Sequence, residues 1–189
     1  LGEHSEEELT EAFNNSIANW NLYMFDGFGS FDPDLIYNRI EYMATGLECK
    51  IIFLDHLSIL LSGLSGDERR MIDSTMTKLR SLVERTGIAL FLVSHLRRSN
   101  NDSNAHEEGG RVSLSQLRGS HSIAQISDNL VGLEVDQQSE GGRSPTTVRI
   151  LKNRYSGETG TCGTLDYNLN TCRFTEHEAE PEFNPSTDF

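Results

Sequence analysis

The sequence lacks the features that mark secreted and membrane proteins. Only three cysteines occur in 189 residues, which argues against a framework of disulfide bonds and favours a reducing cytosol. No apolar run approaches the roughly 18 residues that a membrane helix needs. The first residues have neither the basic nor the apolar region of a signal peptide, and no initiator Met begins the chain. We therefore expect a cytoplasmic protein, of which this chain is the C-terminal part.

Two kinds of binding motif are also missing. The six histidines show no metal-ligand spacing, so no zinc site is expected. No G-x-x-x-x-G-K-[ST] occurs, so the chain has no phosphate-cradling loop of that kind.

The net charge of -13 argues against sequence-blind binding of nucleic acid by the whole surface. Basic residues nevertheless gather in the middle of the chain, so a local basic surface that binds nucleic acid is still compatible with the sequence.

The strongest positive signal is a pair of apolar strands that end in polar residues. Residues 50–54 lead to Asp55, and residues 88–93 lead to His95. Apolar runs of this length indicate buried parallel strands. Residues 67–85 predict a connecting helix with one apolar stripe, which completes a right-handed crossover. Open α/β sheets bind ligands beyond the C-terminal ends of such strands, so Asp55 and His95 are expected to border a ligand crevice.

The rest of the chain predicts further helices and strands around this unit. The expected elements are a helix over 5–18, a strand over 21–25, a helix over 33–44, a helical turn over 113–117, strands over 129–135 and 147–152, and a hairpin over 163–174. The polar stretch between the second strand and the helical turn is long enough to indicate a functional or disordered loop. We divide the chain into a lead-in (1–46), a core (47–174) and a disordered acidic tail (175–189).

Five short motifs follow one another from residue 53 onward. They are Phe-Leu-Asp-His at Asp55, Val-Ser-His-Leu at His95, Leu-Arg-Gly-Ser at Arg118 and Gly119, Gln125 with Ser127-Asp128, and Leu-Lys-Asn-Arg-Tyr-Ser-Gly at Lys152 and Arg154. Together they resemble the C-terminal half of the RecA-like core of hexameric replicative DNA helicases of the DnaB class. The Asp-Glu-Arg-Arg-Met-Ile-Asp helix, the His-Glu-Glu-Gly loop and the acidic tail ending in Phe resemble the podovirus primase–helicases most closely. The resemblance extends from about Leu47 to the end of the chain.

This resemblance implies an α/β fold and an NTP-driven motor. The fold would be a RecA-like, mostly parallel sheet flanked by helices, with antiparallel strands and a hairpin at the C-terminal end. The activity would be translocation on single-stranded DNA by a hexameric ring, which unwinds duplex DNA during replication. For a phage-encoded enzyme the location would be the cytoplasm of the bacterial host.

The resemblance also assigns roles around the nucleotide. Asp55 would be the Walker B carboxylate that holds Mg²⁺ against ATP or dTTP, and His95 would sense the γ-phosphate. Arg154 would be an arginine finger that reaches the neighbouring subunit's site, with Lys152 on the same face of its strand. Tyr167 would stack on the base. The structural alternatives are a strand-end Asp, a core His, a half-exposed strand pair, and a core or surface Tyr.

Further residues are assigned to DNA and to coupling. Arg118 and Gly119 would lie on a loop that faces the central channel and touches the DNA backbone, where Gly permits close approach of the main chain. Arg97 and Arg98 would add basic charge in the preceding loop. Gln125 would couple these loops to the nucleotide site. A solvated loop Arg is the alternative for Arg118.

The acidic tail and two departures from the family pattern complete the comparison. The tail ends in Phe189, and the resemblance implies docking on the replicative DNA polymerase, although a solubilising tail fits the composition equally well. Val135 and Ala124 stand where the podovirus pattern has arginines near the base and on the DNA loop.

The missing phosphate loop bears on what this chain can do alone. In this family that loop, the water-activating Glu and the primase zinc motif all lie upstream. We therefore expect the chain by itself neither to hydrolyse NTP nor to unwind DNA. Two other functions stay open, namely another RecA-like ATPase such as a recombinase or clock-type regulator, and a non-catalytic module that docks partners through the acidic tail.

Overall fold

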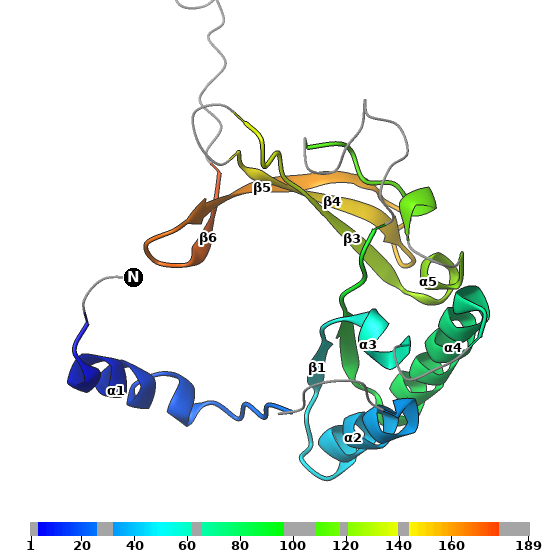
Figure 1. Ribbon diagram of the computed structural model, residues 1–189, viewed down its shortest axis with the longest axis horizontal. Coiled ribbons are helices and arrows are strands. Elements are labelled where there is room, and N and C mark those ends of the chain that lie inside the picture. Colours follow the sequence, from blue (N-terminus) through cyan, green and yellow to red (C-terminus); the bar gives the residue numbers. More distant parts are fainter. Residues whose placement is uncertain are drawn as a thin grey trace, which may run out of the picture.

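A parallel sheet and an antiparallel sheet organise the chain (Figure 1). The computed structural model describes residues 4–25, 32–61, 66–96, 109–117, 121–139 and 144–177. β1 (Ile51–Leu54) and β2 (Ala89–Leu92) pair in parallel over their full length. The antiparallel sheet has the order β3 (Asn129–Glu134), β4 (Thr146–Asn153), β5 (Gly160–Asn168) and β6 (Arg173–Glu176).

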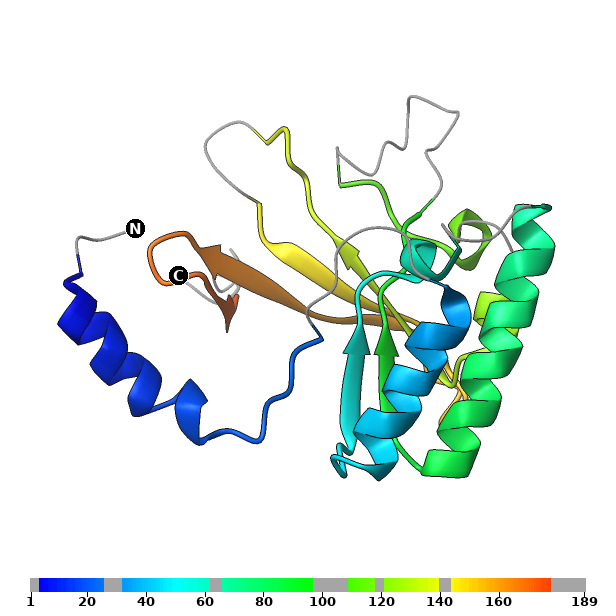
Figure 2. The same ribbon diagram turned by 60° about the horizontal axis from the view of Figure 1, so that its bottom comes forward.

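Three helices cover one face of the parallel pair (Figure 2). They are α2 (Pro33–Thr45), α3 (Leu57–Leu61) and α4 (Glu68–Thr86). Ile52 on β1 is buried against apolar residues of these helices, and Leu90 on β2 packs on the same core. Removal of this apolar surface from water is the main force that holds helices and strands together. The core therefore lies beneath the two strands that carry the predicted site.

The longest helix, α4, shows why the sequence forms it. The Asp67 side chain accepts the Arg70 N–H at 2.9 Å and so caps the first turn. Ile72, Met76 and Leu79 form the buried stripe. The helix ends at Gly87, whose φ of 69° is left-handed, a conformation that glycine adopts without steric cost.

The opposite face of the parallel pair is apolar and uncovered within the described residues. We call it the outer face; it carries Ile51, Phe53 and Phe91, which are 59%, 72% and 52% exposed. The Phe53 and Phe91 rings stack with centroids 4.8 Å apart. Parallel sheets in proteins are normally covered on both faces. The outer face is therefore an unusual surface for a parallel sheet.

The N-terminal helix stands apart from both sheets in both views (Figures 1 and 2). α1 (Glu6–Asn14) is held by a capping box between Ser5 and Glu8, and it buries no residue. A short 3₁₀ helix, η1 (Ile17–Asn19), follows it. The strand expected over 21–25 is not formed, because this segment is extended but has no ladder partner among the described residues.

The expected α/β class is confirmed, with corrections to its parts. The described strands comprise two parallel and four antiparallel ones, so the parallel portion is smaller than expected. The expected turn near 113–117 is the 3₁₀ helix η3 (Leu114–Gln116), whereas α3 and α5 (His121–Ile126) were not expected. No helix in the described ranges is long and apolar enough to cross a lipid bilayer. The tail from 178 onward lies outside the described residues.

Candidate functional site

The C-terminal ends of β1 and β2 bring two predicted site residues to one edge of the sheet. Beyond the strands, the Val93 N–H donates to the Leu54 carbonyl at 3.0 Å, and the Leu57 N–H donates to the Val93 carbonyl at 2.9 Å. These bonds keep the two chain segments side by side where Asp55 and His95 follow. Both residues are exposed, as a ligand-binding pair must be.

A residue that the motifs did not single out completes this edge. The His56 ring meets the His95 ring edge to face, with centroids 4.4 Å apart. His56 Nδ1 is buried and has no hydrogen-bond partner in the described part of the chain. Contact with His56 restricts the orientation of the His95 ring. The signal in the sequence was its place directly after Asp55.

The Asp55 carboxylate is suited to bind Mg²⁺. Mg²⁺ in phosphate-binding sites uses one or two carboxylates together with substrate phosphates and water. Asp55 offers one exposed carboxylate at the edge where open α/β sheets bind ligands. The described residues hold no group of three His, Cys, Asp or Glu side chains that could bind a metal ion on their own.

Lys152 and Arg154 lie together at the end of α5. Lys152 Nζ donates to the carbonyl oxygens of Ala124 at 2.6 Å, Ser127 at 2.7 Å and Gln125 at 3.1 Å. Arg154 Nη2 donates to the Gln125 carbonyl at 2.9 Å. The last carbonyls of a helix have no partner within it and carry partial negative charge, so cations there stabilise the helix end. Burial, followed by the charge of Arg154, lowers the pKa of Lys152.

Asp128 joins this cluster to α4. Its Oδ1 lies 3.0 Å from Arg154 Nη1, and its Oδ2 lies 2.7 Å from Arg80 Nη1. Arg80 also pairs with Glu84 at 2.8 Å. Hydrogen bonds to Glu84 and Asp128 raise the pKa of Arg80. The motif comparison included Asp128 but gave it no role, because its partner Arg80 lies 48 residues away.

The structure therefore separates the predicted nucleotide residues into two groups. No hydrogen bond or ion pair between described residues joins Asp55 or His95 to Lys152 or Arg154. Tyr167 lies on the β5–β6 hairpin, where its ring centroid is 4.9 Å from that of Phe174. The predicted residues outside the described ranges are Arg97, Arg98, Arg118, Gly119 and Phe189.

Residues 109–117, which precede the predicted DNA loop, are anchored at two points. The Val112 N–H donates to Glu134 Oε1 at 2.8 Å, and Arg149 donates to both oxygens of Glu134, at 2.6 and 2.9 Å. At its other end, Leu117 forms an antiparallel bridge with Leu96. The segment thus ties the antiparallel sheet to the residue that follows His95.

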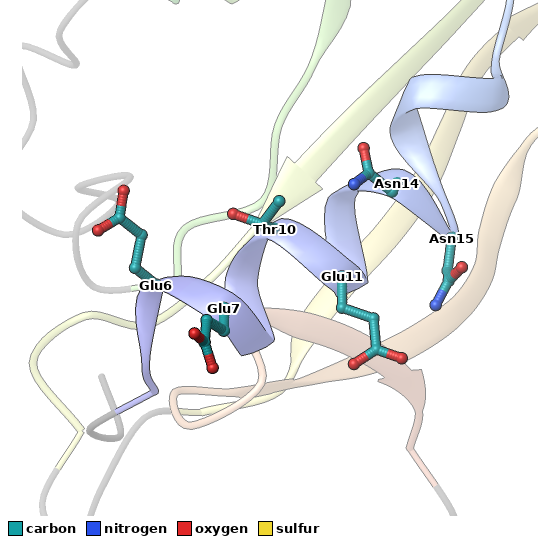
Figure 3. Close-up of a pocket in the computed structure, with 6 residues that line it drawn as sticks. All are labelled: Glu6, Glu7, Thr10, Glu11, Asn14 and Asn15. Atoms are coloured by element: carbon teal, nitrogen blue, oxygen red, sulfur yellow. The ribbon is translucent and has the colours of Figure 1, made fainter.

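Two hollows in the surface of the described residues lie away from the predicted site. One runs along α1 and is lined by Glu6, Glu7, Thr10, Glu11, Asn14 and Asn15 (Figure 3). In this view the Glu6 carboxylate points away from those of Glu7 and Glu11, so the acids do not converge on one point. A second, between α2 and α4, is lined by polar residues such as Asn38 and Thr77. Neither hollow contains a predicted site residue.

Comparison with known proteins identifies the family. The model of the DnaB-like helicase C terminal domain matches residues 1–176. The chain is also similar to the DNA helicase/primase of Enterobacteria phage T3, with 39% identity over 164 residues, or 85% of this chain and 28% of the phage protein. The chain belongs to the DnaB-like helicase C-terminal domain family. It spans less than a third of the length of the phage T3 protein.

Solved structures agree with the fold. A solved ATPase domain superposes with a TM-score of 0.73 at 23% identity, and the match covers 93% of this chain and 62% of that chain. A KaiC-like protein from Pyrococcus horikoshii OT3 superposes with a TM-score of 0.55 at 13% identity, over 78% of this chain and 58% of its own. The resemblance stated from the motifs is thus confirmed at the level of family and fold.

Proposed function

We propose that this chain is the C-terminal part of the motor domain of a ring-shaped replicative DNA helicase. The motor would use NTP hydrolysis to translocate on single-stranded DNA and unwind duplex. The observation that carries this proposal is that, in a chain of the DnaB-like family, Asp55 and His95 follow adjacent parallel strands at the edge where such sheets bind ligands.

In this proposal the strand ends hold the nucleotide. Asp55 binds Mg²⁺, and the nucleotide is ATP or dTTP. When bound, Mg²⁺ neutralises charge on the β- and γ-phosphates. His95 reads the γ-phosphate through its exposed ring, which His56 orients by edge contact. Tyr167 stacks on the base.

Arg154 acts on the site of a neighbouring copy. In this chain its guanidinium is paired with Asp128 and Gln125, not with the group around Asp55, which fits a role in trans. An arginine finger supplied to a neighbouring site raises the hydrolysis rate by about 10³–10⁵-fold. Lys152, near the end of β4, supports it from two residues earlier in the chain. The working assembly would then be a hexameric ring of this protein.

DNA contact falls to the loops on either side of residues 109–117. Arg118 and Gly119 contact the phosphate backbone, and Arg97 and Arg98 add charge that attracts it. Gln125 couples these loops to the nucleotide site through α5. The bridge between Leu117 and Leu96 supports this coupling, because it joins the end of segment 109–117 to the residue after His95.

The remaining proposals concern the tail and the setting. Phe189, at the end of an acidic segment, would dock on the replicative DNA polymerase. The protein would work in the cytoplasm of a bacterial host. This chain alone would be inactive, because it carries no phosphate-cradling loop.

The test is hydrolysis by the complete protein that contains this chain. Asp55→Asn removes the charge that binds Mg²⁺, and we expect DNA-stimulated NTP hydrolysis to fall by about 100-fold or more. Asp34→Asn, at an exposed acid that pairs with Lys78, is the matched control and should retain the wild-type rate. Wild-type hydrolysis by Asp55→Asn would contradict the role of Asp55. Absence of any hydrolysis by the complete wild-type protein would instead favour the non-catalytic docking module.

A further inference from the structure

Asp128 lies between two arginines from different elements. Arg154 follows β4, and Arg80 lies on α4, and each takes a different oxygen of the same carboxylate, at 3.0 and 2.7 Å. The side chains of Arg154, Arg80 and Asp128 are 42%, 32% and 28% exposed, respectively. The arrangement is therefore half-enclosed, where a charge pair is less weakened by water than at an open surface.

Arg154 is held by a fork at its two terminal nitrogens. Nη1 faces the Asp128 carboxylate, and Nη2 donates to the Gln125 carbonyl at 2.9 Å. Two contacts of this kind fix both the position and the plane of a guanidinium. An arginine without them would move among many rotamers, and ordering it at each catalytic cycle would cost free energy.

We propose that Asp128 is a positioning residue that presents Arg154 to the neighbouring subunit and links its movement to α5. The inference rests on the proposed function of Arg154 and adds a role for Asp128 and Arg80. Arg154 also holds the carbonyl of Gln125, and α5 begins directly after residues 118–120 of the predicted DNA loop. Movement of Arg154 toward a phosphate would therefore release a bond at one end of α5.

Arg80 makes that movement easier. If Arg154 leaves, the carboxylate of Asp128 remains paired through its other oxygen with Arg80. A half-buried carboxylate left without any partner would resist the departure, because desolvated charge is costly. Lys152 keeps its bonds to Ala124 and Ser127, so α5 stays capped. The cluster thus has the parts needed for two arrangements of Arg154.

The experiment measures kcat and KM for NTP in the complete protein with single-stranded DNA. Asp128→Asn should lower kcat by roughly 10- to 100-fold with little change in KM, because a misplaced group costs rate more than ground-state binding. Asp128→Glu keeps the charge and should restore part of the rate. Glu84→Gln, at the other acid paired with Arg80, is the matched control and should behave as wild type.

A double variant separates positioning from a purely structural role. In an Arg154→Gln background, Asp128→Asn should add no more than about two-fold, since it acts through Arg154. A full and additive loss in that background would overturn the inference. So would wild-type kcat in Asp128→Asn while Arg154→Gln is inactive. If Arg154→Gln itself retained wild-type activity, the proposed function of Arg154 would be the part that fails.

Discussion

At the scale of single residues, Glu134 and Arg149 form an enclosed ion pair that also holds a loop. Their side chains are 6% and 15% exposed, and Glu134 additionally accepts the Val112 N–H. The packing around Val112 is close, because a Cβ added at Gly132 would lie 3.3 Å from the Val112 side chain. This pair fixes the segment that leads into the predicted DNA loop.

Glu134→Gln should therefore be strongly destabilising. The substitution removes the carboxylate that pairs with the Arg149 guanidinium and leaves that charge half-satisfied in an enclosed place. Gln keeps one acceptor oxygen, so we expect the loss of a charge-assisted hydrogen bond, about 1.5–3 kcal/mol in the free energy of unfolding. Chemical denaturation at neutral pH measures it. Glu41→Gln, at an exposed pair with Arg85, is the same change and should cost about 1 kcal/mol or less.

The same pair makes stability depend on pH in a defined direction. The hydrogen bonds from Arg149 lower the pKa of Glu134, so its stabilising contribution is present above the ordinary Glu pKa of about 4.3. The contribution is lost as the pH falls through the lowered pKa. We expect the difference in unfolding free energy between wild type and Glu134→Gln to be large at pH 7 and to shrink toward pH 3. A difference that is constant over this range would show that the carboxylate charge is not the cause.

At the scale of elements, the long helix and the apolar strands were predictable, whereas the short helices α3 and α5 were not. The helix over 67–85 and the strand ends at Asp55 and His95 follow from periodicity and apolar runs, and the structure places them where expected. α5 has six residues, too few to show a helical period, and it is held by Lys152 on β4 and by Arg154 directly after that strand. Local sequence carries no trace of such contacts.

In the segment over 21–25, by contrast, a strand was predicted that the structure does not form. Its residues are typical of a strand, yet a strand also requires a neighbour that shares its hydrogen bonds. In the described residues it has none, and Met24 is 86% exposed. Propensity alone therefore produced the wrong element, because pairing is decided by tertiary structure.

The end of α4 permits a quantitative test at this scale. Gly87→Ala places a side chain at a left-handed φ of 69°, and an added Cβ would meet nothing within 4 Å. The cost is then conformational alone, about 1 kcal/mol in the free energy of unfolding. Gly163→Ala, where φ is not positive and the space is also open, should stay within about 0.5 kcal/mol of wild type. Equal effects of the two substitutions would contradict the assigned helix end.

At the scale of the whole molecule, the predicted site residues fall into two separate groups, and one face of the parallel pair is uncovered among the described residues. Asp55 and His95 lie in one group. Arg154 and Asp128 lie in another, in which the Arg154 guanidinium is bound by groups of the same chain. The outer face leaves Phe53 and Phe91 uncovered among the described residues. Under the proposed function, groups outside this chain complete each nucleotide site. The sequence of this chain locates the residues of the site but not such partners.

The last prediction follows from the missing phosphate-cradling loop. The purified 189-residue chain should show no DNA-stimulated NTP hydrolysis and no unwinding, because no G-x-x-x-x-G-K-[ST] loop is present to cradle the phosphates. The complete protein, assayed at the same concentration of sites, is the positive control, and its Asp55→Asn variant is the negative one. Phosphate release and strand separation are the two readouts. Robust hydrolysis by the 189-residue chain, lost in Asp55→Asn, would mean that these residues bind triphosphate by another route and that the site is already whole.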